Sequence, residues 1–105
     1  AQNNNIVNAI IKNGLAIPLL DCYPNPFTNT LMIEYQLPEN AQKAELIITD
    51  LTGKEFSKFK LSVNSSFYFM YGYGFKPGMY IMQLKVDGIV IERVKLIYQK
   101  ANNYY

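Results

Sequence analysis

The sequence predicts an all-β fold, an antiparallel sandwich built from about seven short strands. Hydrophobic and polar residues alternate along residues 31–37, turn-forming residues interrupt the chain at short intervals, and Asp87-Gly88 stands between two runs rich in β-branched and aromatic residues. Alternation with period two places every second side chain on the same face of a strand. Short strands separated by regular turn signals are typical of sandwiches.

The chain begins with an approach segment, residues 1–18, that precedes the strand-like pattern. Its run IVNAIIKNGLAI is broken by Asn13-Gly14 and suits a short helical turn and an extended linker equally well. From residue 19 the pattern becomes strand-like. Along residues 31–37 the inward face consists of Leu31, Ile33, Tyr35 and Leu37.

Two hairpins are predicted in the rest of the chain. Residues 44–49 form a strand with Leu46 and Ile48 inward, and a turn at residues 50–53 leads into a second strand, with Gly53 free to adopt a positive φ. The Asp87-Gly88 pair predicts a type I′ turn between the strands before and after it. We expect one inward face made of Tyr80, Met82, Leu84 and Val86, and another made of Val90, Val94, Leu96 and Tyr98, interrupted by Glu92. Arg93 and Lys95 are expected to face solvent.

The residue inventory argues against catalysis and against a bound cofactor. The chain has no histidine, which removes the usual general base near neutral pH and most zinc sites. Cys22 is the only cysteine, and we expect a small buried or half-buried thiol beside Tyr23. The carboxylates form no D-x-D-type cluster and are expected to lie on solvated faces. We therefore expect no enzymatic activity, no metal and no cofactor.

Length and charge limit the partners further. A chain of 105 residues is most simply a single domain, and its net charge of +2, with scattered Lys and Arg, is too small to indicate nucleic-acid binding. No apolar run approaches the roughly 18 residues that a transmembrane helix needs. No signal peptide is visible, so any export signal is expected outside this chain.

Five landmarks occur in a fixed order between residues 19 and 100. YPNPF precedes an alternating strand that closes with LPEN, a TDLTGKEF hairpin follows, and KPGMYIMQLKVDG leads into the terminal strand VKLIYQK. In this order the chain resembles the C-terminal sorting domain of type IX secretion cargo, the type A kind found in Bacteroidetes. The flagellar hook-cap immunoglobulin-like domain shares YPNPF-like and LP-like landmarks. That family carries a longer insertion with a WDG-type stretch, and this chain has no tryptophan.

The resemblance implies a fold, a role and a set of partners. The fold is an immunoglobulin-like sandwich of about seven strands over residues 19–100, with residues 101–105 as a tail. The role is a signal that directs a fused upstream cargo through the periplasm and across the outer membrane to the cell surface or the medium. The implied partners are the outer-membrane translocon and its shuttle β-barrel. In many cargoes a cell-surface sortase removes the domain and joins the cargo to an anionic lipopolysaccharide.

Two groups of residues carry the family's motifs. The structural motifs fall on Tyr23, Pro24, Asn25, Pro26, Gly78 and Tyr80. For translocon recognition the resemblance points to the terminal strand, at Lys95, Leu96, Ile97, Tyr98 and Lys100. A terminal strand at a sheet edge is expected to offer unpaired backbone groups to a receptor. The two prolines are expected to fix where the first strand begins.

Two features depart from the family pattern. The tail ANNYY continues past Lys100, and the segment FYFMYGYGF, residues 67–75, is unusually aromatic. Tyr68, Tyr71 and Tyr73 form a candidate surface for a partner or for sugar rings, so an immunoglobulin-like carbohydrate-binding or adhesion module is the alternative function. The competing interpretation places Phe67 and Phe69 inward and the tyrosines over the rim of the sandwich.

Overall fold

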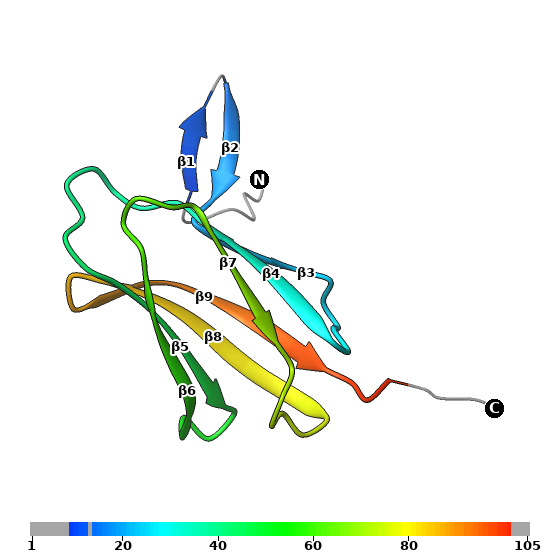
Figure 1. The fold of residues 1–105 in the computed structure, drawn as a ribbon. Helices are drawn as coiled ribbons and strands as arrows, with labels where there is room; N and C mark the ends of the chain where they lie inside the picture. Colours follow the sequence, from blue (N-terminus) through cyan, green and yellow to red (C-terminus); the bar gives the residue numbers. More distant parts are fainter. Residues whose placement is uncertain (1–8, 13, 102–105) are drawn as a thin grey trace, which may run out of the picture.

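The computed structural model describes residues 9–12 and 14–101, which form nine β-strands and no helix (Figure 1). Within this part of the chain, no segment is a helix able to cross a bilayer. In chain order the strands are β1 (Ala9–Lys12), β2 (Leu15–Pro18), β3 (Leu20–Tyr23), β4 (Thr30–Tyr35), β5 (Ala44–Asp50), β6 (Glu55–Leu61), β7 (Phe67–Tyr71), β8 (Gly78–Val86) and β9 (Ile89–Tyr98).

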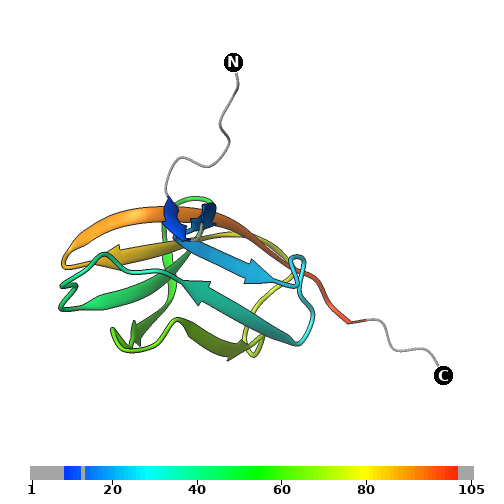
Figure 2. The same cartoon turned by 90° about the horizontal axis from the view of Figure 1, so that it is seen from above.

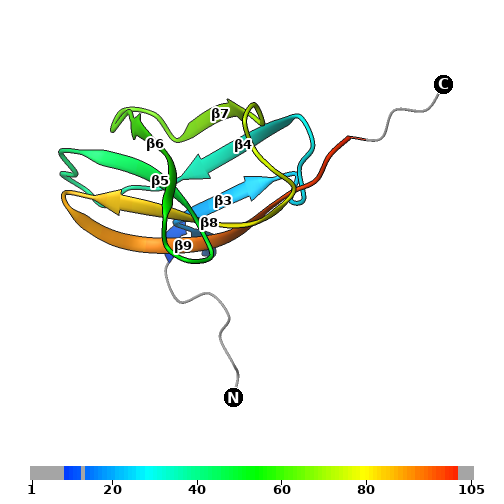
Figure 3. The same ribbon diagram turned by 90° about the horizontal axis from the view of Figure 1, so that it is seen from below.

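Strands β3 to β9 form two antiparallel sheets that pack face to face. One sheet has the order β3-β4-β7 and the other the order β6-β5-β8-β9, and every neighbouring pair within them is antiparallel. Figures 2 and 3 show the two layers from above and from below. These three-stranded and four-stranded layers confirm the predicted all-β sandwich of about seven strands.

Period-two alternation decides which side chains fill the space between the sheets. The predicted inward residues of β4, β5 and β8 are buried, as expected for strands with one face on the core. Burying such a side chain stabilises the fold by about 1.5–3 kcal/mol. The Tyr35 hydroxyl donates a 2.8 Å hydrogen bond to the Ser62 carbonyl, so this buried polar group is satisfied. The fully buried large side chains are Phe27, Leu31, Ile33, Tyr35, Leu46, Ile48, Met82, Leu84 and Leu96.

Both predicted hairpins are present. Between β5 and β6, the Asp50 carboxylate accepts hydrogen bonds from the Thr52 and Lys54 backbone N–H groups and from the Thr52 hydroxyl, while Gly53 has a φ of 91°. Between β8 and β9, Asp87 and Gly88 have φ of 49° and 86°, as a type I′ turn requires.

The predicted inward face of β9 needs one correction. The pairing with β8 shifts register between Leu84 and Lys85, so Glu92 lies opposite Leu84 while Val90 lies opposite Lys85. Val90 is therefore on the outward face, and Ile91 packs against the core in its place. The extra residue of this irregularity reverses the alternation before Glu92.

Strands β1 and β2 pair antiparallel as a separate two-stranded sheet, so these two runs are neither helical nor unpaired. Both strands project beyond the sandwich in Figure 1. Gly14, just before β2, has a φ of 78°, a backbone conformation that a residue with a side chain rarely adopts and that does not occur within an α-helix. The start of the approach segment, up to residue 8, lies outside the described residues.

Candidate functional site

The loop that joins β3 to β4, residues 24–29, is called the proline loop here and lies along the terminal strand β9. Both Tyr23-Pro24 and Asn25-Pro26 are cis peptide bonds. The Asn25 side-chain amide donates to the Lys95 carbonyl at 2.8 Å, and its oxygen accepts from the Ile97 N–H at 2.9 Å. With one donor and one acceptor, this side chain bonds to β9 as a neighbouring strand would.

Phe27 extends the same pairing toward the end of β9. Its N–H donates to the Ile97 carbonyl at 2.9 Å, and its carbonyl accepts from the Gln99 N–H at 3.0 Å. The bridge that results, between Phe27 and Tyr98, is parallel. The prediction of an edge with unpaired backbone groups is therefore wrong for this stretch of β9, because the proline loop already occupies it.

An aromatic cluster made of Phe27, Phe75, Tyr80 and Tyr98 joins the proline loop to the G-x-Y motif. The Phe27 ring is fully buried and contacts Phe75 and Tyr98 edge-on, with ring centroids 5.3 and 5.1 Å apart. Phe75 in turn contacts Tyr80 at 5.0 Å. The Tyr80 hydroxyl donates to the Lys76 carbonyl at 2.6 Å and accepts from the Lys76 N–H at 3.1 Å, which anchors the β7–β8 loop.

Two glycines, Gly72 and Gly78, allow the backbone to pack in this way around the aromatic cluster. Gly78, in the G-x-Y motif, has a φ of 151°, outside the range that other residues readily adopt. At Gly72 a Cβ would lie 2.8 Å from the Tyr98 ring and 3.2 Å from the Phe27 ring, so the close approach of β7 to the aromatic cluster requires glycine. The sequence places the motifs about 50 residues apart, and only the fold shows that the proline loop, the G-x-Y motif and β9 share one end of the sandwich.

The five residues predicted for translocon recognition divide between two faces of β9. Leu96 is fully buried and Tyr98 belongs to the aromatic cluster. Lys95 is exposed and Ile97 half-buried on the outer face, where they lie opposite Ile81 and Met79 of β8. Lys100 is exposed just beyond the strand. In the folded domain, Lys95 and Lys100 are exposed, Ile97 and Tyr98 are half-buried, and Leu96 is fully buried.

The register also gathers basic residues that are scattered along the sequence. The outward positions of the four-stranded sheet carry Lys58, Lys60, Lys85, Arg93 and Lys95. Glu45 lies between Lys60 and Lys85 on the same face. The outer surface around Ile97 is thus apolar at Ile81 and Met79, with Lys95 on its β9 side and Glu55, beyond Thr49, on its β6 side.

The aromatic segment is oriented differently from either prediction. Tyr68 points toward the other sheet and contacts Phe59, with centroids 5.2 Å apart, so it does not share a surface with Tyr71 and Tyr73. Phe67 and Phe69 point outward and are 57% and 47% exposed, so the expectation that they face inward is wrong.

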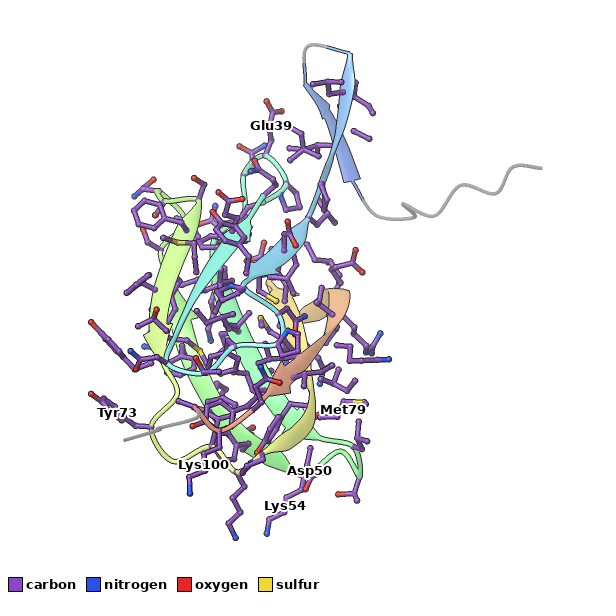
Figure 4. All side chains as sticks on the ribbon, turned by 90° about the vertical axis from the view of Figure 1, so that its right-hand side faces the viewer. Glu39, Asp50, Lys54, Tyr73, Met79 and Lys100 are labelled. Carbon is purple, nitrogen blue, oxygen red and sulfur yellow. The ribbon has the colours of Figure 1, made fainter. Side chains whose placement is uncertain are left out.

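The exposed tyrosines of this segment lie together. Tyr71 and Tyr73 are 52% and 82% exposed, and their rings stack with centroids 5.7 Å apart. Figure 4 shows Tyr73 and Met79 on opposite sides of the molecule. On the same outer face as Tyr71, Tyr23 donates a 3.1 Å hydrogen bond to Glu34, which raises the pKa of Tyr23.

Cys22 is buried, as expected from the sequence, and is 6% exposed. Burial, with a smaller contribution from the charge of Asp21, raises the pKa of its thiol to about 11. The thiol therefore stays protonated at neutral pH, which suits packing and not nucleophilic chemistry.

A comparison with known protein families finds a match over most of the chain. The chain matches the family model described as the secretion system C-terminal sorting domain over residues 21–99. This match runs from the second residue of β3 through β9 and includes the proline loop, the G-x-Y motif and the terminal strand. No curated protein matches the chain.

Proposed function

Because this chain belongs to the family of type IX secretion C-terminal sorting domains, we propose that it directs a fused upstream cargo through the periplasm and across the outer membrane. Membership of the family implies export to the cell surface or beyond and interaction with the secretion machinery. The family is one of sorting signals and not of catalysts, which supports a non-catalytic role. The partners in this proposal are the outer-membrane translocon and its shuttle β-barrel.

The observation that carries the proposal is the arrangement at the end of β9. The proline loop fixes the strand through Asn25 and Phe27, and this leaves Lys95 and Ile97 presented on the outer face. We propose that the translocon contacts these side chains, together with Lys100, and not the backbone edge that the loop occupies. A fixed strand presents its side chains at defined spacing, which supports selective recognition.

A reporter fusion tests the sorting role. Residues 19–105 are joined to a fluorescent protein with a general export signal and expressed in a Bacteroidetes host. We expect the reporter at the cell surface or in the medium. A folded fusion that accumulates in the periplasm would contradict the sorting role itself.

A matched pair of double variants tests the recognition surface separately. Lys95→Glu/Ile97→Glu places two acidic residues on the outer face of β9, and we expect surface export to fall by on the order of tenfold or more. Ile47→Glu/Lys58→Glu makes the same chemical change on the same sheet, at a cross-strand pair remote from β9, and should leave export intact. Circular dichroism confirms folding of both. Equal export by the two variants would refute recognition at β9 without refuting the sorting role.

We also propose that a cell-surface sortase removes the domain and transfers the cargo to an anionic lipopolysaccharide. The support for this step is family membership alone. Mass spectrometry of the surface-exposed reporter tests it, since removal leaves the cargo without residues of the sorting domain. A surface reporter that keeps the whole domain would show that this domain is retained.

The stacked pair Tyr71 and Tyr73 favours a second candidate function, carbohydrate binding. Exposed aromatic rings offer flat apolar faces on which sugar rings stack. Titration of the protein with a glycan panel, observed through the tyrosine NMR signals, tests this candidate. Tyr73→Ala should abolish any shift, and an unchanged spectrum with every glycan would exclude binding of those sugars.

A further inference from the structure

The sandwich has four sheet edges, and three of them carry features that oppose pairing with another strand along at least part of their length. On β9 the proline loop occupies the backbone groups from Lys95 to Gln99. On β6 the register directs the backbone of Lys58 and Lys60 toward the edge, and exposed lysines there oppose strand addition. Edge strand β3 has only four residues and lies beside β9. Its Cys22 N–H donates to the Asp21 carboxylate at 2.9 Å.

The edge of β7 is less protected, because among the described residues only the Ser65 hydroxyl contacts its backbone groups, at Phe67. Hydrogen bonds from Tyr35 N–H to Ser66 and from Gly72 N–H to Asn29 show that even-numbered residues of β7 pair with β4. The backbone groups of Phe67, Phe69 and Tyr71 therefore point away from the sheet. Those of Phe67 make only long contacts, 3.3 and 3.4 Å, with the Ser65 hydroxyl.

For Phe69 and Tyr71, no backbone partner at this edge occurs among the described residues. The strand FYFMY carries no charge, no proline and no register shift. Figure 3 shows β7 at the rim of the molecule, with no described strand beyond it.

We propose that the edge of β7 pairs with β7 of a second copy of this chain, antiparallel and about a two-fold axis at Phe69. In this register Phe69 lies opposite Phe69 of the other copy, and Phe67 lies opposite Tyr71. All of these residues direct their backbone toward the edge, so the three pairs can exchange about six hydrogen bonds. The two three-stranded sheets then form one continuous sheet, and their outward aromatic rings meet across the junction. The proposal does not depend on the sorting role.

The chemistry of β7 favours a second copy as its partner. A two-fold axis pairs the edge with another copy of itself, so an edge with charged residues, such as that of β6, would bring like charges together. The edge of β7 is uncharged, and its sequence alternates similarly in both directions around Phe69, so the same aromatic pairs form on either side of the axis. The junction therefore brings no like charges together and pairs aromatic residues with aromatic residues on both sides of the axis.

The exposed area indicates that the interface is small. Phe67, Phe69 and Tyr71 are each about half exposed, which leaves on the order of 100 Å² per ring for burial. Three rings supply on the order of 300 Å² per copy, well below the roughly 800 Å² per partner of a standard stable interface. We therefore expect a weak dimer that dissociates in the micromolar to millimolar range.

Sedimentation velocity across a concentration series tests the association with the full 105-residue chain. Phe69→Lys places two lysines at the axis and should weaken the dimer by on the order of 100-fold. Leu51→Lys, at a side chain 62% exposed in the β5–β6 turn, makes the same charge change away from β7 and should leave the dimer unchanged. A monomer at millimolar concentration, or a dimer that Phe69→Lys does not weaken while the variant stays folded, would overturn the proposal.

Cysteine cross-linking tests the register. Opposite residues of a hydrogen-bonded antiparallel pair have Cα atoms about 5.5 Å apart, which a disulfide can span. Phe69→Cys should therefore form a covalent dimer on oxidation. Tyr71→Cys should not, because its two copies would be separated by about 13 Å along the strands. The wild type is the control, since its only cysteine is buried. A covalent dimer from Tyr71→Cys and none from Phe69→Cys would contradict the register.

Discussion

Asn25 is a single side chain that holds the two ends of the sorting domain together. Its amide bonds to Lys95 and Ile97, 70 and 72 residues further along the chain. Asparagine is suited to this position because one side chain supplies both a donor and an acceptor. Aspartate would keep the acceptor for the Ile97 N–H but would direct a second oxygen at the Lys95 carbonyl. This explains in physical terms why the middle residue between the two prolines is an amide.

Asn25→Ala should lower the free energy of unfolding by about 1–2 kcal/mol, because two hydrogen bonds are lost. Urea unfolding measures this change, and amide exchange at Ile97 should become faster because its N–H loses its acceptor. Asn64→Ala, at an exposed asparagine in the β6–β7 connection, is the control and should change stability little. Equal stability of Asn25→Ala and the control would show that the side chain does not hold β9.

Gly72→Ala should destabilise the domain by about 1–3 kcal/mol through overpacking. The added methyl group would lie 2.8 Å from the Tyr98 ring and 3.2 Å from the Phe27 ring, and both rings belong to the packed aromatic cluster. Tyr98→Leu removes the nearer ring, so the cost of Gly72→Ala should be smaller in that background. A double-mutant cycle by thermal or urea unfolding measures this coupling. Strictly additive effects would show that the close approach is relieved elsewhere.

At the scale of strands and turns, the β5–β6 turn predicts a dependence of stability on pH. The hydrogen bond from the Thr52 hydroxyl is the largest cause that lowers the pKa of Asp50 below its usual value of 3.8, and backbone N–H groups of Lys54 and Thr52 add to it. The unfolded chain keeps the higher pKa. The contribution of the carboxylate is therefore fully present above pH 3.8 and is lost as pH falls through the lower pKa of the folded state.

Asp50→Asn keeps the turn's acceptor but removes the titrating group, so it isolates this effect. Its Tm should lie below that of the wild type at pH 6, and the difference should shrink as the pH falls below 3.8. Thermal unfolding followed by circular dichroism between pH 6 and pH 3 gives the measurement. A constant difference in Tm over this range would show that ionisation of Asp50 does not stabilise the turn.

The strands that flank the turns could be predicted from the sequence, because the alternation of hydrophobic and polar residues and the choice of turn residues are both visible within a short stretch of chain. Residues such as Leu31 and Leu84 occupy positions fixed by period two, and Asp87-Gly88 fixes its own turn. Alternation cannot by itself say which face of β7 is inward when both faces are aromatic. Tyr68 and Met70 are inward because β7 pairs with β4 in the register that aligns them with Ile33 and Leu31.

The candidate site was less predictable because its contacts are not local. Nothing near Asn25 in the sequence indicates that its amide reaches Lys95. The register shift that turns Val90 outward depends in the same way on the pairing of β9 with β8. Resemblance to the family located the motifs, and only the fold shows that Leu96 is unavailable to a partner while Lys95 and Ile97 are presented.

At the scale of the whole molecule, the two ends of the sequence make unequal contributions to the sandwich. The hairpin of β1 and β2 forms its own sheet and projects beyond the body of the domain. The end of β9 supplies Leu96 to the core, Tyr98 to the aromatic cluster and the backbone partners of the proline loop. Loss of one buried leucine costs about 2–5 kcal/mol, a large part of the 5–15 kcal/mol that stabilises a typical domain.

A chain that ends at Val94 should therefore lose the cooperative fold and not only the residues proposed for recognition. A chain that begins at Leu19 lacks the β1–β2 hairpin but keeps every strand of the sandwich, and its Tm should stay within a few degrees of the full-length value. Near-UV circular dichroism and thermal unfolding of the two truncated chains provide the comparison. If the chain ending at Val94 unfolded cooperatively with a Tm close to that of the full chain, the end of β9 would be dispensable for the fold. If it does not, loss of export after C-terminal truncation reports unfolding, and only folded variants such as Lys95→Glu/Ile97→Glu can test the surface proposed for translocon contact.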